Sequence, residues 1–167
     1  TDIELGDTMS LDKVPFTKIR KEILNQYKRG GMSSLSWHLR NPLTGGDSWD
    51  VSDTTVVKSI LPGGANHEKF TGWVSKVSAF INSLQTEEGV KVPVLFRPWH
   101  EHTGSWFWWG EKLCTPEEYK ALWHMTVDIL RNDGVDNALY AYSPGSEPQD
   151  TAQYLKRYPC LLYTSPS

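Results

Sequence analysis

The sequence predicts an α/β fold in which helices cover a parallel sheet. Two observations support this prediction. Apolar residues recur at helical spacing in several segments, and short stretches of strand length, some of them apolar throughout, lie between those segments. Strands that are apolar runs, separated by amphipathic helices, are typical of parallel sheets buried on both faces. We therefore expect helices and strands to alternate along the chain, beginning and ending with a helix.

The first half of the chain contains two predicted helices and two predicted strands. The first helix is indicated by apolar residues at helical spacing, namely Phe16, Ile19, Ile23, Leu24 and Tyr27. A pair of glycines at positions 30 and 31 ends this helix, and residues 32–37 then predict a strand. A second apolar stripe at helical spacing covers residues 70–84, and the apolar run at residues 92–96 predicts the next strand.

The second half of the chain opens with a clear helix start. Thr115 is suited to the N-cap, Pro116 to the first helical position, and Glu118 completes a capping box with Thr115. The buried face of this helix is predicted to consist of Tyr119, Leu122, Trp123, Thr126, Ile129 and Leu130. Residues 138–142 predict a third strand, and residues 149–158 predict a last short helix.

Two long loops follow the first two predicted strands. Residues 41–66 form a connection rich in glycine and proline, and residues 101–113 form the second loop. Both loops leave from the C-terminal end of a strand, which is where α/β barrels and open α/β sheets place their active sites. An eight-stranded barrel takes about 250 residues. Three strands in 167 residues therefore predict a partial barrel or a small open sheet.

Composition excludes several classes of function. The chain has the length of one domain and is 38% hydrophobic, which is enough to build a core. It carries 17 basic and 20 acidic residues and has no basic run, so the attraction that drives nucleic-acid binding is missing. No apolar stretch is long enough for a membrane span, and no signal peptide pattern opens the chain. The two cysteines form no CxxC pair and receive no role.

The most informative segment is residues 97–110, which reads RPWHEHTGSWFWWG. It places one carboxylate, two imidazoles, one guanidinium and four indoles directly after a predicted strand. A carboxylic acid held partly out of water, beside flat apolar rings on which pyranose rings stack, is what glycoside hydrolysis needs. We therefore interpret Glu101 as a catalytic acid/base. The alternative is an ion pair between Glu101 and Arg97, because such pairs are common at loop edges.

Residues from all three strand ends are expected to join Glu101. His38 follows the first strand, and a parallel sheet would bring it into the same mouth. Arg97 is expected to hold carboxylates by bidentate hydrogen bonds. His100 and His102 could each orient Glu101, contact sugar hydroxyls or satisfy backbone groups. Tyr142 ends the third strand and could equally line the site or belong to the core.

The tryptophans divide by position. Trp73 and Trp123 lie at helical spacing among apolar residues, which predicts that they belong to the core. Trp106, Trp108 and Trp109 lie in a loop bounded by glycines, which favours a platform for a ligand.

Other chemistries find little support in the sequence. A metal site is disfavoured because His100 and His102 lack the spacing of a zincin helix. No GxSxG elbow supports a Ser-His-Asp triad, and no phosphate-binding glycine loop is present. We expect no metal and no cofactor.

Four segments together resemble glycoside hydrolase family 26, whose best-known members are endo-β-1,4-mannanases. They are Ser36-Trp37-His38, the run VPVLFRPWHEH at residues 92–102, GSWFWWG at 104–110, and AYSP at 141–144. The likeness covers about residues 4–159. It implies a fragment of a catalytic barrel over residues 1–159, whereas residues 160–167 continue no pattern and are interpreted as a non-native tail.

The resemblance implies a (β/α)8 TIM barrel and a retaining mechanism. The three predicted strands would be strands three, four and five. Glu101 would be the acid/base, and the nucleophile at the end of strand seven would lie outside this chain, so the fragment alone is expected to be inactive. The residues expected to bind a mannan-type polysaccharide are His38, Trp37, Arg97, His100, Trp106, Trp109 and Tyr142. Family members are mostly secreted, which implies an extracytoplasmic location.

Three alternatives remain open at this point. Relatives of the same family attack mixed-linkage β-glucan or β-1,3-xylan, and the sequence does not separate these substrates from mannan. A non-catalytic glycan-binding module would also use aromatic rings, but it needs no carboxylate between two histidines and is usually all-β. The third alternative is a metal-dependent hydrolase.

Overall fold

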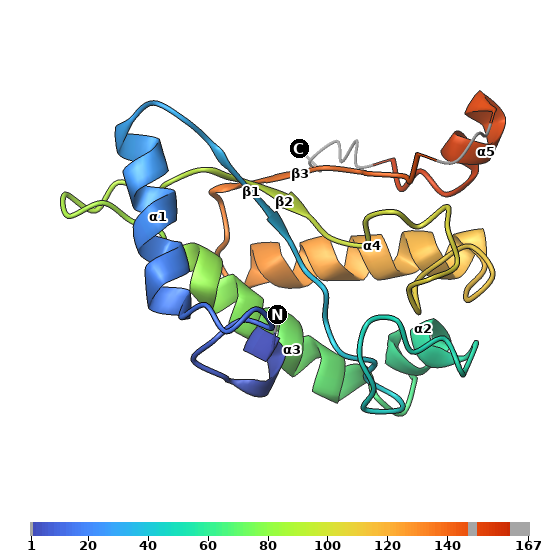
Figure 1. Cartoon of the computed structure of the whole chain (residues 1–167). Coiled ribbons are helices and arrows are strands. Elements are labelled where there is room, and N and C mark those ends of the chain that lie inside the picture. The colour runs from blue at the N-terminus through green and yellow to red at the C-terminus, as the bar shows by residue number, and fades with distance from the viewer. Residues whose placement is uncertain (1, 147–149, 161–167) are drawn as a thin grey trace.

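The computed structural model describes residues 2–146 and 150–160, and Figure 1 shows the whole chain. After a short N-terminal turn, helices and strands alternate, except that two helices lie between the first and the second strand. In chain order, the described elements are the 3-10 helix η1 (Asp2–Leu5), α1 (Phe16–Lys28), β1 (Ser33–Ser36), α2 (Val56–Ile60), α3 (His67–Asn82), β2 (Val94–Arg97), α4 (Pro116–Asn132), β3 (Ala138–Tyr140) and α5 (Thr151–Lys156).

The three described strands form one parallel sheet in the order β1-β2-β3. Ser36 pairs with Arg97 and Phe96 pairs with Tyr140, so the C-terminal ends of all three strands lie at the same edge. Strands that are adjacent in sequence and parallel need a crossover, and the helices between them supply it. The prediction of an α/β protein with a parallel sheet is confirmed.

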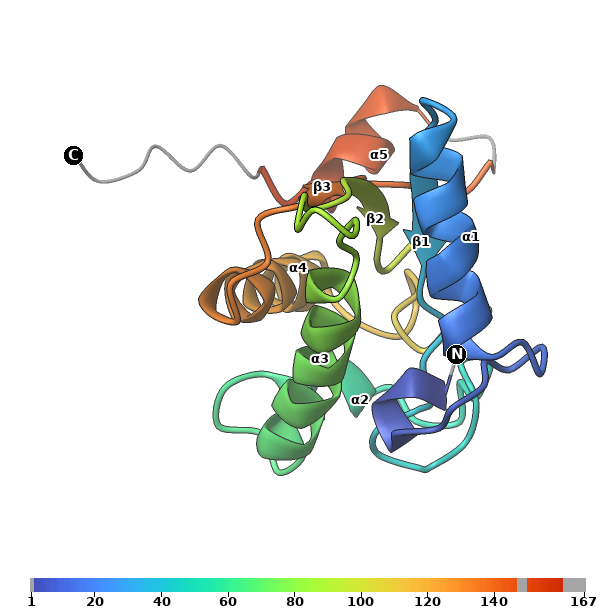
Figure 2. The same ribbon diagram turned by 90° about the vertical axis from the view of Figure 1, so that its left-hand side faces the viewer.

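Helices α3 and α4 pack side by side and cover one face of the sheet (Figures 1 and 2). Val94 and Phe96 on β2 are buried in the same core as the apolar faces of these helices. Leu95 alternates with them and is only half-buried, and its neighbour Leu139 on β3 is 56% exposed. Because side chains alternate across a strand, the second face of the sheet is therefore open as far as the described residues are concerned.

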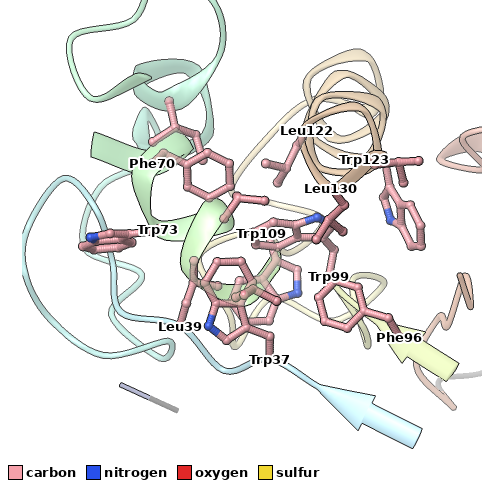
Figure 3. Packing of buried hydrophobic residues seen from close by; sticks show 14 of the residues in the cluster. Trp37, Leu39, Phe70, Trp73, Phe96, Trp99, Trp109, Leu122, Trp123 and Leu130 are labelled. Atoms are coloured by element: carbon pink, nitrogen blue, oxygen red, sulfur yellow. The ribbon is translucent and has the colours of Figure 1, made fainter. Parts of the chain in front are cut away.

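The core is unusually aromatic. Figure 3 shows Trp37, Trp99 and Trp109 meeting between the sheet and the helices. Trp73 and Trp123 are 8% and 0% exposed, which confirms that both belong to the core. Around Trp99 the rings meet edge-on or tilted, an arrangement that aromatic pairs favour, with Trp99 6.0 Å from Trp37 and 5.5 Å from Trp108.

The observed elements follow the predicted ones closely. The capping box at α4 is present, because the Thr115 hydroxyl accepts from the Glu118 N–H at 3.1 Å and the Glu118 carboxylate accepts from the Thr115 N–H at 2.8 Å. Each strand is shorter than the segment predicted for it. Helix α2 was not predicted, because it lies inside the connection at residues 41–66 that is rich in glycine and proline. It forms with Val56, Val57 and Ile60 all buried.

Two further predictions concern the ends and the surface. The interpretation of residues 160–167 as a tail lies, apart from Cys160, outside the described residues. In the part of the chain that the structure describes, no helix has both the length and the apolar character needed to cross a membrane.

Candidate active site

The candidate site lies where the three strands end. β1 continues into Trp37 and His38, β2 ends at Arg97 and leads into Glu101, and β3 leads to Ser143. The Glu101 N–H donates to the Ser143 carbonyl oxygen at 2.7 Å, which ties the turn after β2 to the segment after β3. The predicted convergence of strand ends is therefore the geometry that is seen.

The turn that presents Glu101 is conformationally strained. Trp99 and Glu101 both have a φ of +53°, in the left-handed region that costs a non-glycine residue about 1–2 kcal/mol. Surrounding hydrogen bonds hold this turn. The Tyr119 hydroxyl donates to the Trp99 carbonyl at 2.8 Å, and the Trp109 indole donates to the His100 carbonyl at 2.9 Å. Strain that is held in place by neighbours is typical of functional sites.

Glu101 contacts the indole of Trp106. The Trp106 Nε1–H donates to Glu101 Oε2 at 3.2 Å, and Trp106 is 40% exposed. A β-carbon added at Gly104 would lie 2.2 Å from the Trp106 ring, so the glycine provides the space that the indole occupies. The site thus combines a half-buried carboxylic acid with an exposed flat ring.

His38 and His100 form a direct pair. Their Nε2 atoms are 3.0 Å apart and their ring centroids are 4.5 Å apart. Burial, reinforced by nearby positive charge, lowers the pKa of His100 to about 4, and burial also lowers the pKa of His38. Both rings are therefore neutral near pH 7, and the Nε2–H of one ring donates a hydrogen bond to the unprotonated Nε2 of the other.

Arg97 is bound differently from the prediction. Its Nε donates to the Ser143 hydroxyl at 2.9 Å and its Nη1 donates to the Ser36 hydroxyl at 3.3 Å. We expected bidentate bonds to carboxylates, and that expectation is wrong for the described residues. Arg97 instead joins the ends of all three strands, since Ser36 belongs to β1 and Ser143 follows β3. The alternative ion pair with Glu101 is likewise not seen.

Trp37 and Trp109, which we expected to contact substrate, are buried. Trp37 is 3% exposed and its indole donates to Glu4 at 3.2 Å. Trp109 is 0% exposed and stacks on Phe107 with centroids 4.5 Å apart. Trp108, also considered as a platform, is 0% exposed too. The structure places these rings in the core, where they offer no free face to a sugar.

Tyr142 and His102 pack against each other behind the site. The Tyr142 hydroxyl donates to the Tyr154 carbonyl at 2.6 Å, and burial raises the pKa of Tyr142 to about 12. His102 lies between the rings of Tyr142 and Tyr119, at 4.8 and 4.5 Å, and is 0% exposed. Burial, followed by the charge of Arg157, lowers the pKa of His102 to about 3. His102 is thus a core residue.

Sequence reasoning missed two residues, Trp49, which contacts His38, and Glu4, which contacts its neighbour Trp37. Trp49 is 49% exposed and stacks on the His38 ring at 5.7 Å with an interplanar angle of 15°. Glu4 accepts the Trp37 indole proton. The position of Trp49 in the long loop at residues 41–66 was the available signal, whereas a single glutamate near the N-terminus carried none. Within residues 2–146 and 150–160, no group of three potential metal ligands is present.

Comparison with known families decides the assignment. A model of glycosyl hydrolase family 26 matches residues 11–164. The chain belongs to this family. The carboxylate after β2 and the histidine after β1 therefore lie in a family 26 framework.

Solved structures and curated sequences agree with this membership. A family 26 β-mannanase from Bacteroides ovatus is 61% identical, with a TM-score of 0.93 over 95% of this chain and 46% of that chain. The catalytic domain of an endo-β-1,4-mannanase from Bacillus sp. JAMB-750 is 42% identical, with a TM-score of 0.80 over 86% of this chain and 37% of that one.

Among curated proteins, a mannan endo-1,4-β-mannosidase from Bifidobacterium adolescentis is 40% identical over 144 residues, which is 84% of this chain. A mannan endo-1,4-β-mannosidase from Bacillus subtilis is 30% identical over 74% of this chain. The chain spans 14% and 36%, respectively, of the lengths of these two relatives.

Proposed function

We propose that this chain is part of a retaining, endo-acting β-1,4-mannanase in which Glu101 is the acid/base. In this proposal β1, β2 and β3 are strands three, four and five of a (β/α)8 barrel, and the open face of the sheet points to the barrel interior. Support comes from the family membership, from relatives whose names state mannan hydrolysis, and from the position of Glu101 at the C-terminal edge of the sheet.

Glu101 would act twice in each turnover. In the first step it donates its proton to the glycosidic oxygen while a second carboxylate attacks the anomeric carbon and the bond to the leaving sugar breaks. In the second step Glu101 takes a proton from the water that displaces the enzyme carboxylate. The two carboxyl groups of a retaining enzyme lie about 5–5.5 Å apart. We assign the second carboxylate to residues outside this chain.

The observation that carries the proposal is the hydrogen bond from Trp106 to Glu101. It fixes Oε2 of the carboxylate and leaves Oε1 for the substrate oxygen. It also places an exposed indole beside the proton donor, where a mannose ring can stack.

The remaining contacts would come from the same edge. We propose that His38 and His100 exchange hydrogen bonds with sugar hydroxyls as neutral imidazoles, and that Trp49 adds a second stacking surface. Arg97 and Tyr142 would shape the floor of the site, while Trp37 and Trp109 would support it from below. We further propose an extracytoplasmic location, because a polysaccharide substrate does not cross a membrane unaided.

A chimeric enzyme tests the proposal. Residues 1–159 of this chain replace the matching segment of the Bacteroides ovatus β-mannanase, to which they are 61% identical. The chimera is expected to hydrolyse β-mannan. Glu101→Gln is expected to lower its kcat about 10²- to 10⁴-fold, which is the usual contribution of general acid–base catalysis. Glu111→Gln, which alters an exposed glutamate of the same loop, serves as the matched control and is expected to leave kcat unchanged.

Other outcomes would redirect the assignment. Full activity of the Glu101→Gln chimera would remove Glu101 from the mechanism. Preference for mixed-linkage β-glucan or β-1,3-xylan over mannan would keep the family and change the substrate. Binding of mannan by the chimera without hydrolysis would favour a glycan-binding role, and loss of activity on chelation would favour a metal-dependent hydrolase.

A further inference from the structure

Glu4 is a buried carboxylate with two specific partners. Its side chain is 0% exposed, in the short helix η1 that packs against α3. Oε2 accepts the Trp37 Nε1–H at 3.2 Å, and Oε1 accepts the Arg40 backbone N–H at 2.8 Å. The carboxylate thus links the N-terminal turn to a loop more than thirty residues away in the sequence.

The Glu4 partners bracket His38. Trp37 and Arg40 lie on either side of the two residues His38 and Leu39, so the carboxylate fixes both ends of this short segment. The segment is also held from its other side, because the Leu39 carbonyl accepts the Trp108 indole proton at 3.5 Å. His38 is therefore presented from a segment that is anchored at both ends.

The position of His38 matters because of what it contacts. Its Nε2 lies 3.0 Å from Nε2 of His100, and His100 immediately precedes Glu101. A distance of 3.0 Å is within hydrogen-bonding range and requires one Nε2 to donate and the other to accept. A small shift of the His38 segment would break this bond. His100, in the turn that follows β2, would then lose its imidazole partner.

Retaining a carboxylate in the core is costly. Burial raises the pKa of Glu4, and the hydrogen bonds from Arg40 and Trp37 oppose that rise. In some proteins, buried polar groups are retained because they confer conformational specificity on the segment that they bind.

We propose that Glu4 is a positioning residue that holds His38 against His100 and so keeps the imidazole pair beside Glu101. Its catalytic consequence rests on the proposed function. The structural part of the proposal is independent of that function, because the contact between the two imidazoles can be measured without turnover.

Nuclear magnetic resonance of the isotopically labelled 167-residue chain tests the proposal. The ring 15N shifts of His38 and His100 are followed through a pH titration in the unsubstituted chain, Glu4→Gln and Glu4→Ala. In Glu4→Ala the loosened segment admits water to the pair, which favours the charged imidazolium. The pKa of His100 is then expected to rise by about one unit or more.

Glu4→Gln is expected to act in the same direction with a smaller shift. It keeps one acceptor oxygen, but turns an NH₂ group towards a second N–H donor. Should Glu4→Ala fail to fold, Glu4→Gln decides the question on its own.

Asn137→Ala is the matched control. Asn137 is 8% exposed and its side chain donates to the Ile81 and Val92 carbonyls at 3.2 and 2.9 Å, at the opposite end of the sheet. Its loss should leave both imidazole titrations unchanged. The charges outside the pair that act on it are those of the terminal amino group, Glu101, Arg97 and Asp12, and none of these groups is substituted in any variant.

Two results would overturn the proposal. The first is a folded Glu4→Gln or Glu4→Ala chain in which His38 and His100 titrate as they do in the unsubstituted chain. The second is an Asn137→Ala chain whose imidazoles shift as much as those of the Glu4 variants, because that would indicate general loosening of the fold. Loss of the mannanase assignment alone would leave the measured coupling intact.

Discussion

His100 and His102 lie on either side of Glu101 in the sequence, yet they occupy different environments. His100 pairs with His38 at the strand ends, whereas His102 is enclosed by the rings of Tyr119 and Tyr142. The strained turn at Glu101 separates them. Two identical side chains two residues apart therefore serve site geometry in one case and packing in the other.

The largest expected effect is on acid stability. Both histidines have a pKa in the folded chain below the ordinary value of 6.5, about 4 for His100 and about 3 for His102. The unfolded chain therefore binds protons first as the pH falls below 6.5. Each residue should remove roughly 3–5 kcal/mol of stability, with the loss complete near pH 4 for His100 and near pH 3 for His102.

Urea unfolding of the 167-residue chain from pH 7 to pH 3 measures this loss. His102→Phe should flatten the pH dependence of the free energy of unfolding down to about pH 3, and His100→Phe only down to about pH 4. If the free energy of unfolding depended on pH in the same way in both variants, the proposed difference between the environments of His100 and His102 would be wrong.

The next effect is on packing. His102→Ala removes a ring that is 0% exposed and in contact with two other rings, so it should lower the free energy of unfolding at pH 7 by about 2–4 kcal/mol. His102→Phe keeps a ring without buried unpaired nitrogens and is expected to stay within about 1 kcal/mol of the unsubstituted chain. A stable His102→Ala chain would contradict the packing role. Urea unfolding at fixed pH provides the measurement.

The smallest expected effect on stability concerns His100. His100→Gln retains hydrogen-bonding groups that can reach His38, so the stability at pH 7 should fall by only about 1 kcal/mol. The readout specific to this position is the titration of His38. Burial is the main cause of its lowered pKa, so this pKa should rise towards its ordinary value because glutamine covers the His38 ring less well than the imidazole does. The equivalent change His102→Gln should leave the His38 titration unchanged. A shifted His38 pKa in that variant would contradict the conclusion that His102 lies apart from the imidazole pair.

The contrast between the histidines also indicates what could be predicted from sequence. Helical spacing and the Thr115 capping box predicted α1, α3 and α4, because their signals are local. Parallel strands then required the residues that follow them to converge, which brought His38 and Glu101 together correctly. Both of these inferences depend on chain geometry alone.

Side-chain direction within the turn could not be read in the same way. Trp106, Trp108 and Trp109 share one loop and one residue type, but only Trp106 is exposed. Which ring faces outward depends on the left-handed turns at Trp99 and Glu101 and on space made elsewhere. The contact between Glu4 and Trp37 was equally inaccessible, since nothing in a lone glutamate indicates a partner 33 residues away.

Gly104 illustrates how an absent side chain can govern a functional one. The nearest atoms to its missing β-carbon belong to Trp106, at 2.2 to 2.5 Å, so Gly104→Ala and the present indole position are mutually exclusive. A single methyl group at this position would push the ring away from the acid it touches. Gly104 has no side chain, and this allows the Trp106 indole to lie beside Glu101.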